Sequence, residues 1–252
     1  MSNLLVIVNS NDPFNEEIDF SSQLVDWNVS LVHDTALSLI KLKHYIQQKE
    51  IYFLLFSRKW ESGYLEQVHK ICKDNPLLHI IYYSAQLKDL EFAELYLAGI
   101  DYCIIGDARQ INLIRTLGKL WDEHWRRVPD YLIATAVEQN ALWLDITLDF
   151  IEKKPIKMFN VRTLSEHLQI SENQFRLEFK HQFGKSFRAF KQELFQHYED
   201  ILLFDKKLKP KEVFRYLNYK NLSAFSRSFK MRHGRSWQDC RREEAFSNKK
   251  TI

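Results

Sequence analysis

Cysteine, glycine and proline are scarce in this chain of 252 residues, which contains three, six and five of them respectively. Cys72, Cys103 and Cys240 lie far apart and lack the spacing of metal ligands, which argues against a disulfide framework and a cysteine-based zinc site. We expect buried or incidental thiols in a reducing cytoplasm. The shortage of glycine and proline favours much helix and few long loops.

Long apolar runs and catalytic motifs are also missing. No stretch of 18 or more apolar residues occurs, so the sequence predicts no membrane span. The first residues lack the features of a secretory signal. A phosphate-binding glycine loop, a nucleophile motif and a metal-ligand cluster are absent, and the nine histidines are scattered. We therefore expect a cytoplasmic protein that is not an enzyme, contacts no membrane and needs no cofactor or metal.

Positive charge is concentrated at one end of the sequence. Residues 1–120 contain 11 Lys and Arg against 15 Asp and Glu, and residues 121–155 contain 4 against 7. Residues 156–252 contain 21 against 11, a net charge of +10. A basic segment is typical of proteins that bind polyanions such as nucleic acid, although an inert basic surface has the same composition.

Short apolar runs recur through residues 1–120, separated by mixed segments of helix length. The runs are 4–8, 30–33, 51–56, 77–84 and 101–105. Continuous apolar runs that alternate with helices indicate a parallel sheet covered on both faces. The sequence predicts a doubly wound α/β domain with five parallel strands over residues 1–120.

Two of these runs resemble the receiver domain of bacterial response regulators. IIYYSA at 80–85 is similar to the family's fourth strand with its switch Ser/Thr at Ser84. AGIDYCII at 98–105 places Tyr102 at the family's switch aromatic. The resemblance covers about residues 3–120 and implies a receiver-like fold.

The residues that carry out phosphorylation in receiver domains are replaced in this sequence. The acidic pair that holds Mg²⁺ falls on Asn9 and Ser10, the phosphate acceptor on Phe56 and the lysine on Ile105. These side chains supply neither the carboxylate ligands nor the cation that the chemistry needs. The resemblance therefore implies a pseudo-receiver that aspartyl phosphorylation does not control. The sheet edge at Phe56, Ser84 and Ile105 is either filled or open to an apolar ligand.

Residues 121–155 connect this domain to the basic part of the chain. Apolar residues recur at helical spacing from Tyr131 to Lys153, which predicts one or two amphipathic helices. Such helices are either a linker packed on the chain's own domains or a surface for dimerisation.

A thirteen-residue phrase occurs twice in the basic part. FRLEFKHQFGKSF at 175–187 and FSRSFKMRHGRSW at 225–237 both fit F-x-x-x-F-K-x-x-x-G-x-S-aromatic. The two Phe share a helical face, the Gly suits the left-handed position after a helix, and the Ser can cap the next helix. Two copies predict two equivalent helical units, because a stacked repeat needs about three or more.

The first copy completes a helix-turn-helix pattern. Asn160 or Thr163 can cap a short helix that ends near Leu168. After a turn at 169–170, Ser171 can cap the helix that carries the phrase.

The second copy completes a matching pattern. Pro210 suits the first position of a helix, and Asn218 is one of the few residue types that tolerate a left-handed turn. A long helix over residues 186–204 is predicted to join the two units.

Two helix-turn-helix units joined by a helix resemble the DNA-binding domain of the arabinose-regulator (AraC) family. The resemblance covers about residues 142–242, and LNYKNLSAFSRSFKMRHGRSWQDCR at 217–241 is similar to the family signature. The signature residues that are kept are Asn221, Ser223, Phe225, Arg227, Phe229, Lys230, Gly234, Ser236 and Arg241. The departures are Asn218, Tyr219, Ala224, Trp237 and Cys240 in the signature, Phe195 and Glu199 in the joining helix, and Leu177 in the first unit.

The resemblance implies that residues 156–252 bind double-stranded DNA, with one recognition helix of each unit in the major groove. The side chains expected at base edges are Glu172, Asn173, Arg176, Leu222, Ser223 and Ser226. Those expected at phosphates are Lys180, Lys185, Arg227, Lys230 and Arg235. Phosphate contacts add affinity without sequence information, whereas base contacts specify the site.

These patterns together predict a transcription regulator that binds DNA as a homodimer. Its input is a signalling protein, a small ligand or simply the expression level. The alternative is a protein-interaction adaptor with a degenerate receiver and little or no specific DNA binding.

Overall fold

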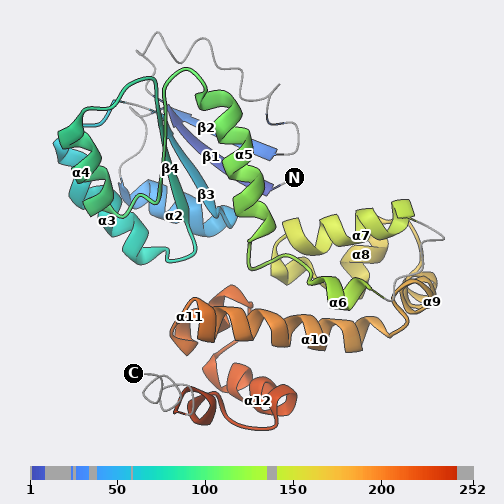
Figure 1. Cartoon of the computed structure of the whole chain (residues 1–252). Helices are drawn as coiled ribbons and strands as arrows, with labels where there is room; N and C mark the ends of the chain where they lie inside the picture. Colours follow the sequence, from blue (N-terminus) through green and yellow to red (C-terminus); the bar gives the residue numbers. More distant parts are fainter. Residues whose placement is uncertain are drawn as a thin grey trace. The chain divides into compact units, whose positions relative to one another are not determined.

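Figure 1 shows the computed structural model of the chain, which describes residues 2–8, 24, 27–33, 39–57, 59–134 and 141–242. The chain divides into two compact units, Met1–Asp122 and Glu123–Ile252. Each unit buries its own set of apolar side chains.

The first unit is built on a parallel sheet. Its described strands are β1 (Ser2–Val8), β2 (Trp27–His33), β3 (Phe53–Ser57), β4 (His79–Ser84) and β5 (Tyr102–Ile105). They form a five-stranded sheet in the order β2-β1-β3-β4-β5, and all four pairings are parallel. This is the flavodoxin-like doubly wound order. The predicted fold class is confirmed, and each strand overlaps one of the predicted apolar runs.

Helices cover both faces of this sheet (Figure 1). The described helices of the unit are α2 (Leu39–Lys49), η3 (Ser62–Tyr64), α3 (Leu65–Asp74), α4 (Asp89–Ala98) and α5 (Arg109–Asp122). Alternate residues of β1 point to opposite faces: Leu5 packs in a cluster with α2, α3 and α4, and Leu4 in a cluster with α5. Burial on both faces explains why the central strands β3 and β4 lie in continuous apolar runs.

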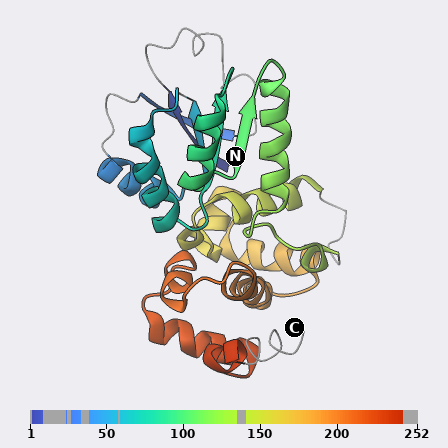
Figure 2. The ribbon, with the colours of Figure 1, turned by 60° about the vertical axis from the view of Figure 1, so that its left-hand side comes forward.

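The second unit is helical, as predicted (Figure 2). Its described helices begin with α6 (Asp130–Ile133), α7 (Ala141–Lys153), η5 (Ile156–Met158), α8 (Val161–His167) and α9 (Glu172–Phe183). They continue with α10 (Phe187–Asp200), the π-helical η6 (Ile201–Asp205), α11 (Pro210–Tyr216) and α12 (Leu222–His233), and residues 237–242 are also helical.

Most of the segment predicted as a connector packs inside the second unit. Trp143 of α7 lies against three phenylalanine rings of α9, with centroids 6.1 to 6.4 Å away. The buried Arg126 donates a hydrogen bond of 2.7 Å to the carbonyl oxygen of Ile151, near the end of α7. Leu142, at the start of α7, remains 70% exposed. The dimerisation role of this segment stays a prediction.

Phenylalanine rings form the core of the second unit. Phe179 stacks on Phe183 at a centroid distance of 4.2 Å and meets Phe187 and Phe190 edge-on at 5.2 Å. Such arrangements are the favoured geometries of aromatic pairs. The Phe pairs of both copies of the repeated phrase are fully buried, so these residues belong to the core.

The three cysteines, Cys72, Cys103 and Cys240, form no disulfide among the described residues. The Cys72 thiol donates a hydrogen bond to Gly99, and burial together with nearby Asp101 raises its pKa to about 11. A thiol with so high a pKa is a poor nucleophile at neutral pH. In the described part of the chain, no helix has the length and apolar character to cross a membrane.

Candidate nucleic-acid interface

The first helix-turn-helix unit consists of α8 and α9. The Asn160 side chain caps α8 by accepting a hydrogen bond from the Thr163 amide at 3.0 Å, and Ser171 caps α9 through the Gln174 amide at 3.2 Å. Between the helices, Gln169 adopts a left-handed conformation with φ of 56°. Each cap satisfies an amide that the helix itself leaves unpaired.

The second helix-turn-helix unit consists of α11 and α12 and repeats this design. Pro210 occupies the first turn of α11, and Asn218 is left-handed with φ of 56°. Asn221 caps α12 by accepting a hydrogen bond from the Ala224 amide at 2.8 Å. The left-handed residue lies two positions before the cap in the first unit and three positions before it in the second. The second turn is therefore one residue longer.

The second helix of each helix-turn-helix unit ends at a left-handed glycine, as predicted. Gly184 follows α9 with φ of 66°, and Gly234 follows α12 with φ of 72°. A side chain at either position would be strained in this conformation. Because caps and glycines coincide, α9 and α12 are equivalent helices at an offset of 50 residues. Figure 1 shows α10 running from the first helix-turn-helix unit to the second.

The predicted base-contacting residues of α9 lie side by side on its exposed face. The Arg176 guanidinium donates hydrogen bonds to the Glu172 carboxylate at 2.7 Å and to Asn173 Oδ1 at 3.3 Å. The Arg176 and Glu172 side chains are 51% and 46% exposed. An exposed ion pair at this spacing contributes only about 0.3–0.5 kcal/mol, so it holds Arg176 in place weakly.

The equivalent face of α12 is less polar. Leu222 and Ser223 are exposed at its start, whereas Ser226 is half-buried. The Ser226 hydroxyl accepts a hydrogen bond from the Trp237 indole nitrogen at 3.1 Å. Trp237 replaces the proline of the AraC signature, so this departure reaches one of the predicted base contacts.

Most predicted phosphate contacts are exposed on the same helices or just beyond them. Lys180 on α9 and Arg227 and Lys230 on α12 are exposed, and so is Arg235 after α12. Lys185 is half-buried and forms an ion pair of 2.6 Å with Glu193. An ion pair with a carboxylate offsets part of the positive charge at this position.

The buried carboxylate of Glu199 on α10 joins this helix to the second helix-turn-helix unit. Its partners could not be predicted from the sequence. Glu199 is fully buried and forms an ion pair with Arg232 of α12, and its carboxylate lies 3.2 Å from Nε2 of His233. The Tyr219 hydroxyl donates to the same carboxylate at 3.3 Å, and burial, with this carboxylate nearby, raises the pKa of Tyr219. The only signal in the sequence is that Glu199 departs from the residue usual at this position in the AraC family.

The receiver-like positions of the first unit lie at or near the ends of the strands. Phe56 is buried among aromatic rings, with centroids of Trp60 and Tyr64 both 5.9 Å away. Among the two alternatives for this edge, the packing around Phe56 favours the filled one. Asn9 and Ser10 lie outside the described residues.

The remaining positions predicted from the receiver resemblance are the last residue of β4 and the first and last residues of β5. The Ser84 hydroxyl donates to the carbonyl oxygen of Gln86 at 2.8 Å. Tyr102 is half-buried, and Ile105 is 36% exposed. Within the described ranges, no group of three or more His, Cys, Asp or Glu side chains could hold a metal ion.

Three kinds of solved structure are similar to this chain. No protein-family model and no curated protein matches the sequence. A CheY-like protein (TadZ) from Pseudomonas aeruginosa is similar over 48% of this chain and 99% of its own, with 17% identity and a TM-score of 0.38. The response regulator RcsB of Salmonella typhimurium is similar over 87% of this chain and 98% of its own, with 12% identity and a TM-score of 0.39. The xylose-binding transcription activator XylR is similar over 94% of this chain and 69% of its own, with 13% identity and a TM-score of 0.34.

Proposed function

We propose that this chain is a transcription regulator, without catalytic activity, that binds double-stranded DNA sequence-specifically. In this proposal residues 1–120 are a receiver-like domain, 121–155 a connector and 156–252 an AraC-type domain with two helix-turn-helix units. One observation carries the proposal: α9 and α12 present equivalent exposed faces from two such units in the basic part of the chain.

The mechanism follows from the geometry of the major groove. A recognition helix fits this groove, where each base pair presents its own pattern of donors and acceptors. Arg176 can donate two hydrogen bonds to guanine, Asn173 can pair with adenine, and Leu222 can contact a thymine methyl group. Lys180 and Lys230 then neutralise phosphates, which makes the affinity depend on salt.

The test of this proposal is selection from a pool of random duplex DNA, followed by sequencing of the bound fraction across a salt series. We expect an enriched motif with two half-sites about one helical turn, ~10 base pairs, apart. The affinity should fall steeply with salt. Weak, salt-sensitive binding without an enriched motif would refute the proposal and favour the protein-interaction adaptor.

Arg176→Ala is expected to weaken binding to the selected motif by roughly 10- to 100-fold, because a bidentate base contact provides about 1–3 kcal/mol of discrimination. Binding to random DNA should change much less. Fluorescence anisotropy with both duplexes measures this difference.

The matched control for Arg176→Ala is Arg162→Ala on α8. Arg162 is exposed and also forms an ion pair with a glutamate four residues later, Glu166, at 2.9 Å. It therefore has the same charge and a similar local contact, but lies on the first helix of the unit. An equal loss of affinity in both variants would contradict base reading by Arg176.

The receiver-like unit is proposed not to accept phosphate, and this has its own test. Phe56 occupies the acceptor position as an aromatic core residue, so beryllofluoride with Mg²⁺ should leave the amide NMR spectrum of the chain unchanged. An aspartyl receiver, which holds Mg²⁺ through carboxylates, serves as the positive control. A saturable shift of amides near Phe56 would contradict the proposal.

Homodimer formation is supported by an apolar surface on α4. Leu90, Phe92, Tyr96 and Leu97 are 74%, 56%, 76% and 63% exposed. Exposed apolar side chains gathered on one helix commonly mark an interface. Sedimentation equilibrium should show a dimer that Tyr96→Glu weakens, and a monomer at all concentrations would remove this part of the proposal.

A further inference from the structure

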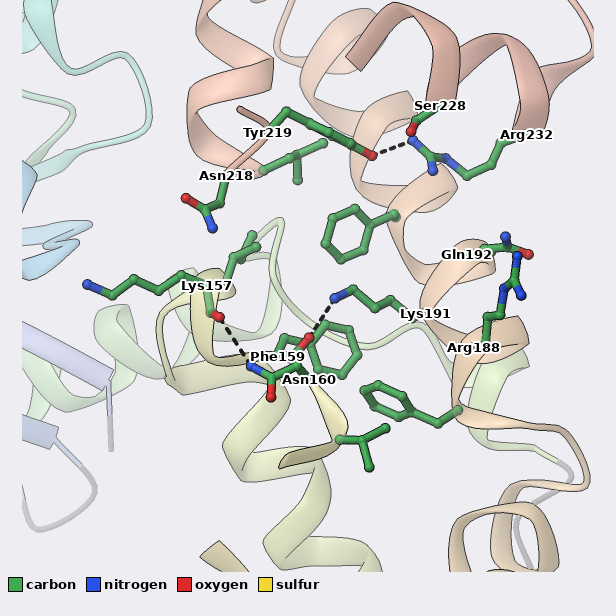
Figure 3. A pocket seen from close by; sticks show the side chains of 15 residues that line it. Lys157, Phe159, Asn160, Arg188, Lys191, Gln192, Asn218, Tyr219, Ser228 and Arg232 are labelled. Atoms are coloured by element: carbon green, nitrogen blue, oxygen red, sulfur yellow. Dashed lines mark hydrogen bonds between the residues drawn. The ribbon is translucent and has the colours of Figure 1, made fainter. Parts of the chain in front are cut away.

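A cavity of about 520 Å³ lies within the second unit, between the two helix-turn-helix units. One wall comes from η5, the start of α8, and α10, and the other from the second turn and α12. Figure 3 shows Lys191 reaching from α10 into this space, with Lys157 and Asn160 on one side and Tyr219 and Arg232 on the other. Its volume lies within the range of about 300–1,000 Å³ that is usual for small-molecule sites.

The charged groups around this cavity are all cationic. Lys157, Arg188, Lys191 and Arg232 line it, and no carboxylate does so among the described residues. Arg232 is neutralised by Glu199 behind it. The other three form no ion pair within the described part of the chain. The cavity therefore favours an anionic occupant.

Lys191 is the best-placed of these cations. Its ammonium group donates a hydrogen bond of 2.6 Å to the Phe159 carbonyl oxygen and lies 5.1 and 5.2 Å from the centroids of the Phe159 and Phe195 rings. An ammonium group has three donors, so two remain for a ligand. Burial lowers the pKa of Lys191, and a nearby anion would raise it again.

Aromatic rings supply the apolar part of the same cavity. Phe159, Phe187 and Phe195 line it and are packed on one another, with the Phe159 centroid 5.1 Å from Phe187 and 6.2 Å from Phe195. The three residues are only 3%, 7% and 7% exposed, so an apolar ligand would contact what remains accessible of this rigid wall.

We propose that this cavity binds a small aromatic carboxylate, whose carboxylate meets Lys191 and whose ring lies against Phe159 and Phe195. A DNA phosphate is a poorer fit, because Lys191 is half-buried among rings whereas the cations on α9 and α12 are exposed. The inference does not depend on DNA binding, because it uses residues that line the cavity and none that are predicted to contact DNA.

Calorimetry on the full chain, without DNA, tests this inference with 2-naphthoate, its neutral amide and inorganic phosphate. We expect naphthoate to bind at least about tenfold more tightly than either other probe, because only naphthoate combines the charge-assisted hydrogen bond with the aromatic contact. Equal binding of naphthoate and the amide, equal binding of phosphate, or no binding of naphthoate would each overturn the proposal.

Variants assign the binding to this site. Lys191→Met keeps the apolar stem and removes the charge, and it should weaken naphthoate binding about tenfold. Arg188→Gln, at an exposed position, should weaken it less and keeps the test informative if Lys191→Met fails to fold. The matched control is Lys211→Met, which removes a charge from an exposed residue of α11 outside the cavity. Unchanged affinity in both cavity variants, or an equal loss in the control, would place the ligand elsewhere.

The position of the cavity also predicts a consequence for DNA binding. Because its walls belong to both helix-turn-helix units, an occupant would hold α12 against α10 and α8. This second readout, a change in affinity for the selected duplex with naphthoate, rests on the proposed function. Calorimetry does not rest on it, so the two proposals can fail separately.

Discussion

Glu199→Ala is expected to lower the free energy of unfolding of the second helix-turn-helix unit by about 3–5 kcal/mol. Glu199 is fully buried and is the counter-ion of Arg232, whose side chain is 11% exposed. Removing the carboxylate leaves this guanidinium buried without its opposite charge. Hydrogen exchange measured by mass spectrometry should show the loss in α11 and α12, and little change in α8 and α9.

Two further variants separate the ion pair from simple packing. Glu199→Gln keeps the shape and a hydrogen-bond acceptor and should cost less than alanine. Glu199→Ala combined with Arg232→Met removes both charges and should recover part of the loss, because an apolar replacement of a buried pair is often tolerated. If the double variant loses as much free energy of unfolding as the two single variants added together, the ion pair does not explain the loss in Glu199→Ala.

Phe179→Ala is expected to destabilise the first helix-turn-helix unit by about 3–5 kcal/mol, since it leaves a cavity at the centre of a packed core. Phe179 is fully buried and contacts the rings of Phe175, Phe183, Phe187, Phe190 and Trp143. Urea unfolding followed by circular dichroism measures the loss, and hydrogen exchange assigns it to α9.

Phe229→Ala is the control for this prediction, because Phe229 occupies the equivalent position fifty residues later. Its ring is also fully buried, but its described ring contacts are Phe225 at 5.8 Å and His233 at 3.8 Å. With fewer rings around the cavity, the loss in α12 should be smaller than that in α9. An equal or larger loss would show that ring contacts do not set the cost.

Most of the fold could be predicted because the signals are local. The central strands β3 and β4 are buried almost throughout, so they appear in the sequence as strong apolar runs, whereas the edge strand β2 is partly exposed and gives a weaker signal. In the second unit, the caps Asn160 and Ser171 each accept a hydrogen bond from an amide three residues later. Asn218 forms its turn through its own left-handed backbone. Caps and left-handed turns are visible in sequence because their partners are neighbours.

The features that could not be predicted depend on partners far away in the chain. Glu199 and Arg232 are 33 residues apart, and Lys191 meets the Phe159 carbonyl across 32 residues. Sequence spacing does not show which of many charged residues will meet once the helices pack. The hydrogen bond between Trp237 and Ser226 is of the same kind, since neither residue type requires the other.

The extra residue in the second turn has a consequence for how chains of this design can change length during evolution. At that turn, the two helix-turn-helix units differ by one residue, yet α9 and α12 both begin at a side-chain cap and end at a left-handed glycine, so a length change there is absorbed locally. A residue inserted into α10 would instead rotate everything after it by ~100° and shift it by about 1.5 Å along the axis. Insertions and deletions among descendants of a common ancestor should therefore accumulate at the turns and be rare in α10.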